Sequence, residues 1–96
     1  TVVSVAYDSN VELVRRLLGD AATRQPRVLQ DPAPNAALSA FGADGLEFTL
    51  GYWIADPENG QLNLRSDINM AILRSLREHG IEIPYPQRIV HMKPGA

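Results

Sequence analysis

Two histidines are the side chains of this sequence best suited to proton transfer at neutral pH, and neither has a partner at a catalytic spacing. His79 follows an apparent helix, and His91 lies in the last strand-like segment. A motif for metal binding or acid–base catalysis would show a histidine with a second ligand or a partner at a characteristic spacing, and no such spacing links these two residues. A histidine in the last turn of a helix more often interacts with the partial negative charge of the helix C-terminus. The sequence therefore predicts that His79 caps a helix and that no metal site is present.

The acidic loop "DPENG", residues 56–60, contains oxygen ligands of the kind that Ca²⁺ prefers. A calcium loop needs oxygen ligands at alternate positions and a closing bidentate glutamate, and both are missing around Asp56 and Glu58. Proline, asparagine and glycine in this order are typical of a turn. We interpret this segment as a turn.

Nucleophilic and phosphate-binding patterns are also missing from the sequence. The chain has no cysteine, which excludes disulfides, thiolate nucleophiles and thiolate metal sites. No serine lies in a nucleophile elbow, and no helix start follows the glycines at 42, 45 and 51. We therefore expect a protein that is not an enzyme and that has no cofactor and no small-molecule ligand.

Length and charge limit the class of protein further. With 96 residues and 45% hydrophobic residues, the chain can form one domain with one core. A formal net charge of −2 gives no electrostatic reason to bind nucleic acid. No apolar run approaches the roughly 18 residues that a transmembrane helix needs. The chain begins inside a strand-like pattern and without a methionine, so we expect a fragment of a longer protein.

Hydrophobic periodicity predicts the elements that position all these residues. A β-branched run at residues 1–7 predicts a strand, and Ser9 with Glu12 forms a capping box for a helix over about residues 10–23. Three prolines in residues 25–36 predict a stiff connection. The remaining predicted elements are strands over 36–41 and 46–55 joined by "GADG", a helix that begins near Asn63 or Ser66 and ends at Gly80, and a strand over 87–92.

This order predicts an α+β fold of the ferredoxin-like βαββαβ type, with a four-stranded antiparallel sheet and two helices on one face. Right-handed crossovers place the first and third strands in the middle of the sheet. Prolines before the second and fourth strands agree with edge positions. We predict one domain over residues 1–92 and a disordered tail over residues 93–96.

The third predicted strand presents a candidate contact residue. Its alternation places Tyr52 and Ile54 on the core face and Trp53 on the opposite face. Large aromatic side chains that are exposed often belong to contacts with another protein. Trp53 is therefore a candidate for a contact between subunits.

The stretch "HGIEIPYPQRIVH", residues 79–91, is a stiff connection between the second helix and the last strand. Pro84 and Pro86 fix their own φ angles and push the residues before them toward extended backbone, so the chain leaves the helix in a narrow range of directions. Tyr85 and Gln87 lie within this connection. We expect Pro84 and Pro86 to hold the connection rigid. We expect Tyr85 and Gln87, like Trp53, to contact other subunits or a neighbouring domain of the parent chain, although Tyr85 could equally cover the end of the core.

Four segments, "YDSNVELV", "RVLQDPAP", "YWIADPENG" and "INMAILRSLREHGIEIPYPQRIVHM", together resemble the C-terminal cytoplasmic αβ domain of the small-conductance mechanosensitive channel (MscS) family. The resemblance covers about Val2 to Met92 and is most specific at "GIEIPYPQ". It implies a channel that opens under membrane tension and releases solutes during osmotic downshock. It also implies that seven copies of this soluble domain form a cytoplasmic cage below the inner membrane, after the membrane helices and a β domain of the parent chain.

Other proteins with the same order of elements provide the alternatives. RNA-recognition modules need basic residues on the central strands, and metallochaperones need paired cysteines, and this sequence has neither. An amino-acid-type regulatory sensor domain is the alternative that stays open, although its usual glycine-bearing loop after the first strand is replaced by "YDSNVE". A saturable ligand in a thermal-shift screen would favour the sensor.

Overall fold

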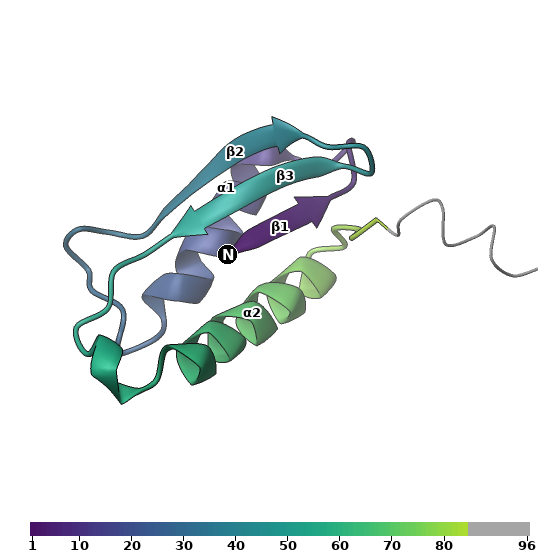
Figure 1. Cartoon of the computed structure of the whole chain (residues 1–96). Coiled ribbons are helices and arrows are strands. Elements are labelled where there is room, and N and C mark those ends of the chain that lie inside the picture. The colour runs from purple at the N-terminus through teal and green to yellow at the C-terminus, as the bar shows by residue number, and fades with distance from the viewer. Residues whose placement is uncertain (85–96) are drawn as a thin grey trace, which may run out of the picture.

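In the computed structural model of this protein, residues 1–84 are described, and they form two helices and an antiparallel sheet (Figure 1). The predicted order of strand, helix, strand, strand and helix is confirmed over these residues. The elements are β1 (Val2–Val5), α1 (Val11–Thr23), β2 (Asn35–Phe41), β3 (Leu46–Gly51), the short 3₁₀ helix η1 (Pro57–Asn59) and α2 (Gln61–Glu78).

The sheet has three strands in the order β1-β3-β2, and β3 pairs antiparallel with both neighbours. Its position between β1 and β2 agrees with the predicted central position of the third strand. The pairing of β2 with β3 is interrupted by an irregularity between Leu38 and Ala40. The described part therefore has three strands where four were predicted, and the predicted fourth strand at 87–92 and the tail at 93–96 lie outside the described residues.

The core lies between the helices and one face of the sheet. In β3 the side chains of Leu46, Phe48 and Leu50 are buried and Thr49 is exposed, which confirms the predicted alternation. Phe48 is completely buried, and burial of a side chain of this kind contributes roughly 1.5–3 kcal/mol. The other buried apolar side chains are Val5, Val14, Leu17, Leu18, Ala21, Ala22, Val28, Ala36, Leu64, Ile68, Ile72 and Leu76, and they form one cluster.

The N-terminus of α1 is capped by Asn10. Its Oδ1 accepts a hydrogen bond of 3.1 Å from the backbone N–H of Leu13, which is the bond expected of an N-cap side chain. The predicted capping box with Ser9 as the cap is wrong, because the capping residue is one position later. The predicted helix bounds differ from the observed ones by only one residue.

The helix α2 begins earlier than the sequence predicts. It starts at Gln61, directly after Gly60, whose φ of 95° lies in the left-handed region that favours glycine. Asn63, one of the two residues predicted near the start, therefore lies in the first turn of the helix, whereas Ser66 lies in its second turn. Within residues 1–84, neither α1 nor α2 combines the length and the apolarity that a bilayer-crossing helix requires.

Candidate assembly surface

The chain leaves α2 through a tight backbone motif. The N–H of Gly80 donates to the carbonyl oxygen of Arg77 at 3.2 Å, and the N–H of Ile81 donates to that of Leu76 at 2.9 Å. Gly80 has a φ of 69°, and these two bonds with a left-handed glycine constitute a Schellman motif. The side chain of Ile81 then packs against the core. The direction of the chain is therefore already set before the first proline.

His79 lies at the C-cap of α2, where the sequence predicts a capping role. Its backbone N–H donates to the carbonyl oxygen of Ser75 at 3.1 Å, and its ring Nδ1 lies 2.9 Å from the same oxygen. When Nδ1 carries the proton, the ring donates a second hydrogen bond to this carbonyl oxygen in the last turn of the helix. The geometry confirms the capping role, and His91 lies outside the described residues.

The segment after Ile81 runs against the end of β1. The backbone N–H of Ala6 donates to the carbonyl oxygen of Glu82 at 2.9 Å. The next contact is at Gly45, where an added Cβ would lie 3.1 Å from Cγ of Pro84 and would collide with the carbonyl oxygen of Val5. Only glycine allows Val5 and Pro84 to approach this turn so closely. The chain that leaves α2 thus packs against the β2–β3 turn at Pro84.

Two of the five residues that were predicted to form the rigid connection and the subunit contacts belong to the described part. Trp53 is 50% exposed, as the strand alternation predicts, and its carbonyl oxygen accepts a hydrogen bond of 2.8 Å from the N–H of Leu29. Pro84 is half-buried. The structure does not bring Trp53 and Pro84 together, because Trp53 follows the end of β3 and Pro84 lies at its start. Tyr85, Pro86 and Gln87 lie outside the described residues.

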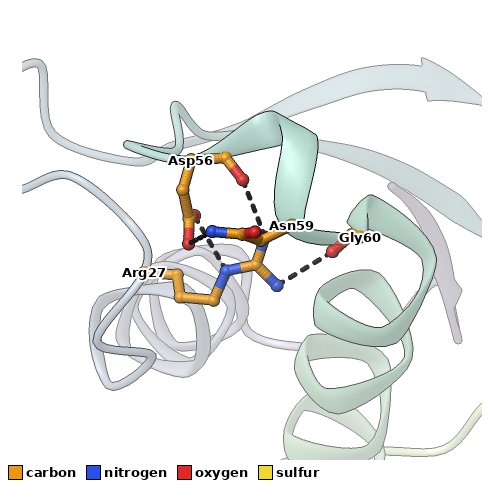
Figure 2. Close-up of polar contacts among 4 residues, drawn as sticks. All are labelled: Arg27, Asp56, Asn59 and Gly60. Carbon is orange, nitrogen blue, oxygen red and sulfur yellow. Dashed lines mark hydrogen bonds and ion pairs between the residues drawn. The ribbon is translucent and has the colours of Figure 1, made fainter.

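Arg27 forms a clamp between two connections that the sequence analysis treats separately (Figure 2). Its Nε donates to Oδ1 of Asp56 at 2.8 Å, and its Nη2 donates to the backbone carbonyl oxygen of Asp56 at 3.1 Å. Its Nη1 donates to the carbonyl oxygen of Gly60 at 2.8 Å. Arg27 thereby ties the connection before β2 to the turn that starts α2, and this holds the backbone that follows Trp53.

The carboxylate of Asp56 is kept ionised by its partners. The hydrogen bond from Arg27 holds the pKa of Asp56 below its ordinary value of 3.8, and the hydrogen bond of 3.2 Å from Nδ2 of Asn59 acts in the same direction. The Arg27 and Asn59 donors are bonded to the carboxylate of Asp56 or to backbone carbonyl oxygens. None of these bonded groups is a nucleophile activated by a neighbouring base. The arrangement is therefore suited to holding shape.

The clamp is the part of this surface that the sequence analysis missed. Asp56 and Asn59 were interpreted as turn formers, and they do belong to a turn. Arg27 is 29 residues away, and no spacing rule connects two loops at that distance. Among residues 1–84, no group of three histidine, cysteine, aspartate or glutamate side chains lies close enough to hold a metal ion.

The chain is similar to mechanosensitive channels in both sequence and structure. Residues 1–83 match the family model "Mechanosensitive ion channel MscS, C-terminal". An uncharacterized MscS family protein of Haemophilus influenzae is 36% identical over 95% of this chain and 8% of its own length. The mechanosensitive channel MscK of Escherichia coli is 34% identical over 94% of this chain and 8% of its own length.

The solved structures lead to the same family. The crystal structure of Helicobacter pylori MscS in its closed state superposes with a TM-score of 0.80 and 29% identity, over 88% of this chain and 33% of that one. The chain thus spans one third or less of each of these three proteins. The resemblance seen in the sequence is confirmed, and this chain belongs to the MscS family of mechanosensitive ion channels, whose C-terminal domain it matches.

Proposed function

We propose that this chain is the cage-forming domain of a mechanosensitive channel. In this role it scaffolds the oligomer and borders the path of the solutes that the channel releases during osmotic downshock. The match to the MscS C-terminal model over residues 1–83 supports the proposal, as does the superposition on the H. pylori channel. The function is mechanical and electrostatic, and no chemical reaction is part of it.

The observation that carries the proposal is the fixed exit from α2. The Schellman motif at Gly80, the bond from Ala6 to Glu82 and the contact of Pro84 with Gly45 leave the chain little freedom of direction. In a ring of identical subunits, an angular error at each copy accumulates around the symmetry axis. A rigid exit is what such a ring needs from each of its subunits.

The partners in this proposal are six further copies of the same chain, which complete a heptamer, and the β domain and membrane helices of the parent protein. The domain then lies on the cytoplasmic side of the inner membrane. Its unit extends over residues 1–92, and Trp53, Pro84, Tyr85, Pro86 and Gln87 contribute the stiff connection and the contacts. Among residues 1–84 we find no feature that favours the small-molecule sensor alternative.

Survival of osmotic downshock tests this function. The full-length protein that carries these 96 residues is expressed in a bacterial strain without its own mechanosensitive channels, and the cells are transferred from high to low osmolarity. The proposal predicts survival well above that of the same strain with an empty vector. Equal survival of the two strains, with the protein present in the membrane, contradicts it.

A further inference from the structure

The free edge of β1 and the exposed side of α2 form one surface, which we call the β1–α2 face and define by Val2, Ser4, Met70, Leu73 and Arg74. We propose that this face binds a second copy of the chain in a head-to-tail contact. The inference rests on the proposed function and deepens it, because it names the surface through which neighbouring copies meet.

The backbone of β1 has hydrogen-bonding groups to offer at this face. Thr1 exchanges two bonds with Leu50 of the neighbouring β3, of 3.2 Å and 2.8 Å, so Thr1 faces β3. Backbone groups alternate in direction along a strand, so those of Val2 and Ser4 face away from β3. Ala6 fits this pattern, because its N–H reaches Glu82 on the outer side. Within residues 1–84, Val2 and Ser4 therefore present their N–H and C=O groups at an edge that no other strand covers.

The two edges of the sheet differ in their protection. The edge strand β2 follows Pro32 and Pro34, has an irregularity at Ser39, and has one carbonyl, that of Ala36, bonded to Nε of Arg15 at 3.1 Å. These are the devices by which proteins block pairing at an exposed edge. The strand β1, "VVSV", has no proline, no charge and no irregularity. An unprotected apolar edge of this kind is expected to be covered by another chain segment.

The end of the same chain is poorly suited to cover this edge. The bond between Ala6 and Glu82 fixes the register that an antiparallel continuation of the chain along β1 would have. In that register Pro84 would lie opposite Ser4, and Pro86 would lie opposite Val2. A proline has no N–H, and these are the positions that must donate to β1. The sequence of this continuation therefore disfavours its pairing with β1, and we assign the edge to a different copy.

Apolar side chains extend the face from β1 across α2. Three hollows of about 270, 340 and 470 Å³ all include Leu73 in their lining, and each also shares Asn69 or Met70 with a neighbouring hollow, so they form one continuous surface. Figure 1 shows α2 beside β1 at the rim of the molecule. Four of the seven exposed large apolar side chains of the described part lie here, and they are Val2, Leu62, Met70 and Ile83.

Charge selects the kind of contact. The hollows on α2 are lined by Arg65, Arg74, Arg77 and Glu78, which carry a net charge of +2. The whole chain has a formal net charge of −2, so the remainder carries −4. If two such faces met, arginine would lie against arginine and the contact would be repulsive. If this face met the negatively charged remainder of another copy, the electrostatic interaction would be attractive. Head-to-tail contacts close into a ring when the rotation from one copy to the next closes, as the proposed cage requires.

A photo-crosslinker placed at Met70 tests the proposal in the purified full-length protein. Met70 is 53% exposed, so p-benzoylphenylalanine at this position leaves the core intact. The expected result after illumination is a ladder of covalent multimers that continues beyond the dimer. A dimer band alone indicates a face-to-face contact, and a product that stays at the mass of one chain shows that the face is covered by its own chain or left open. Each of these two results overturns the proposal.

Matched variants separate the contact from the fold. The crosslinker at Arg16, an exposed position on α1, is expected to give no ladder beyond background. Reversal of charge by Arg74→Glu with Arg77→Glu is expected to abolish the ladder from Met70, and Arg16→Glu with Arg24→Glu is expected to leave it unchanged. An intact ladder in the first pair, with native circular dichroism in both pairs, contradicts the assigned face.

The crosslinking result at Met70 and the survival of downshock test the assigned face and the channel function separately. If the protein rescues cells from downshock but gives no ladder at Met70, the channel function stands and the assigned face is wrong. If it gives the ladder but rescues no cells, the face stands and the channel function fails.

Discussion

The backbone N–H of Ala6 donates a hydrogen bond of 2.9 Å to the carbonyl oxygen of Glu82. This bond joins the residue after the first strand to the segment that leaves the last helix of the described part. It positions Pro84 against Gly45, so the exit, the first strand and the β2–β3 turn form one rigid unit. A domain that must deliver its chain in a fixed direction to a ring gains from this arrangement.

Substitution of Gly45 tests the packing of this unit. Gly45→Ala places a Cβ in collision with the carbonyl oxygen of Val5 and 3.1 Å from Pro84, and overpacking of this kind typically costs about 1–3 kcal/mol. We expect a corresponding decrease in the free energy of unfolding of the 96-residue chain in urea.

The control for Gly45 is Gly19, in α1, where an added Cβ has no atom within 4 Å. Gly19→Ala is expected to increase the free energy of unfolding by about 0.5–1 kcal/mol, because alanine favours the helix. A Gly45→Ala variant as stable as the original chain would show that the contact with Val5 and Pro84 is not tight.

The clamp between Arg27 and Asp56 predicts a dependence of stability on pH. The pKa of Asp56 is lowered in the folded state by the hydrogen bonds from Arg27 and Asn59, so the unfolded state binds more protons in acid. Stability from this group is present above pH 3.8 and is lost as the pH falls through the lowered pKa. Asp56→Asn is expected to lower the free energy of unfolding at pH 7. It is also expected to make this free energy depend less on pH in the acid range.

Urea unfolding between pH 7 and pH 2.5 measures this effect. The difference between the original chain and Asp56→Asn is expected to shrink as the pH falls below the ordinary pKa of the carboxyl group. Glu58→Gln, which removes an exposed carboxylate two residues away, is the control. If the two chains differ by the same free energy of unfolding from pH 7 to pH 2.5, the contribution of Asp56 to stability does not depend on its charge.

The exposed Trp53 is expected to matter for assembly more than for folding. Its side chain is half exposed, and surface substitutions usually change stability by within about 0.5 kcal/mol, so Trp53→Ala should leave the domain folded. Phe48→Ala, at a fully buried position of β3, is expected to cost about 3–5 kcal/mol.

The oligomer of the full-length protein distinguishes the role of Trp53 from that of a surface residue without a contact. Large aromatic residues at interfaces often contribute more than about 2 kcal/mol, and Trp53→Ala should therefore shift the native mass distribution toward smaller assemblies. An unchanged distribution would remove Trp53 from the contact.

The two prolines of the connection are expected to affect assembly in the same way. Pro84→Ala with Pro86→Ala frees the backbone after Ile83 and restores two N–H donors, so the direction of the exit becomes less defined. We expect weaker assembly of the full-length protein by native mass spectrometry and altered gating. Unchanged oligomer size and gating would show that the motif at Gly80 is sufficient.

Local sequence patterns predict the elements well where the physics is local. The alternation of Leu46, Phe48 and Leu50 predicts the buried face of β3, and the periodicity of the two helices predicts their core sides, because both depend on a fixed repeat along the chain. The choice between Ser9 and Asn10 as the cap is different. Both residues have a suitable oxygen, and only the path of the backbone decides between them.

The contacts that stiffen the surface depend on distant residues and are not visible in local patterns. Arg27 meets Asp56 and Gly60 because two connections converge in space, and its bond to the carbonyl of Gly60 lies directly before the start of α2 at Gln61. The prolines of the exit are visible in the sequence, whereas the bond from Ala6 to Glu82 is not. Sequence alone therefore predicts Trp53 and Pro84 as candidates but not what holds them.

Patch-clamp recording tests the central claim most directly. Membrane patches that contain the full-length protein are placed under graded suction, with patches from the empty-vector strain as the control. The account predicts a conductance that opens above a threshold of membrane tension and closes when the suction is released. Patches that contain the protein and show no tension-dependent conductance up to the tension at which the membrane ruptures would contradict it.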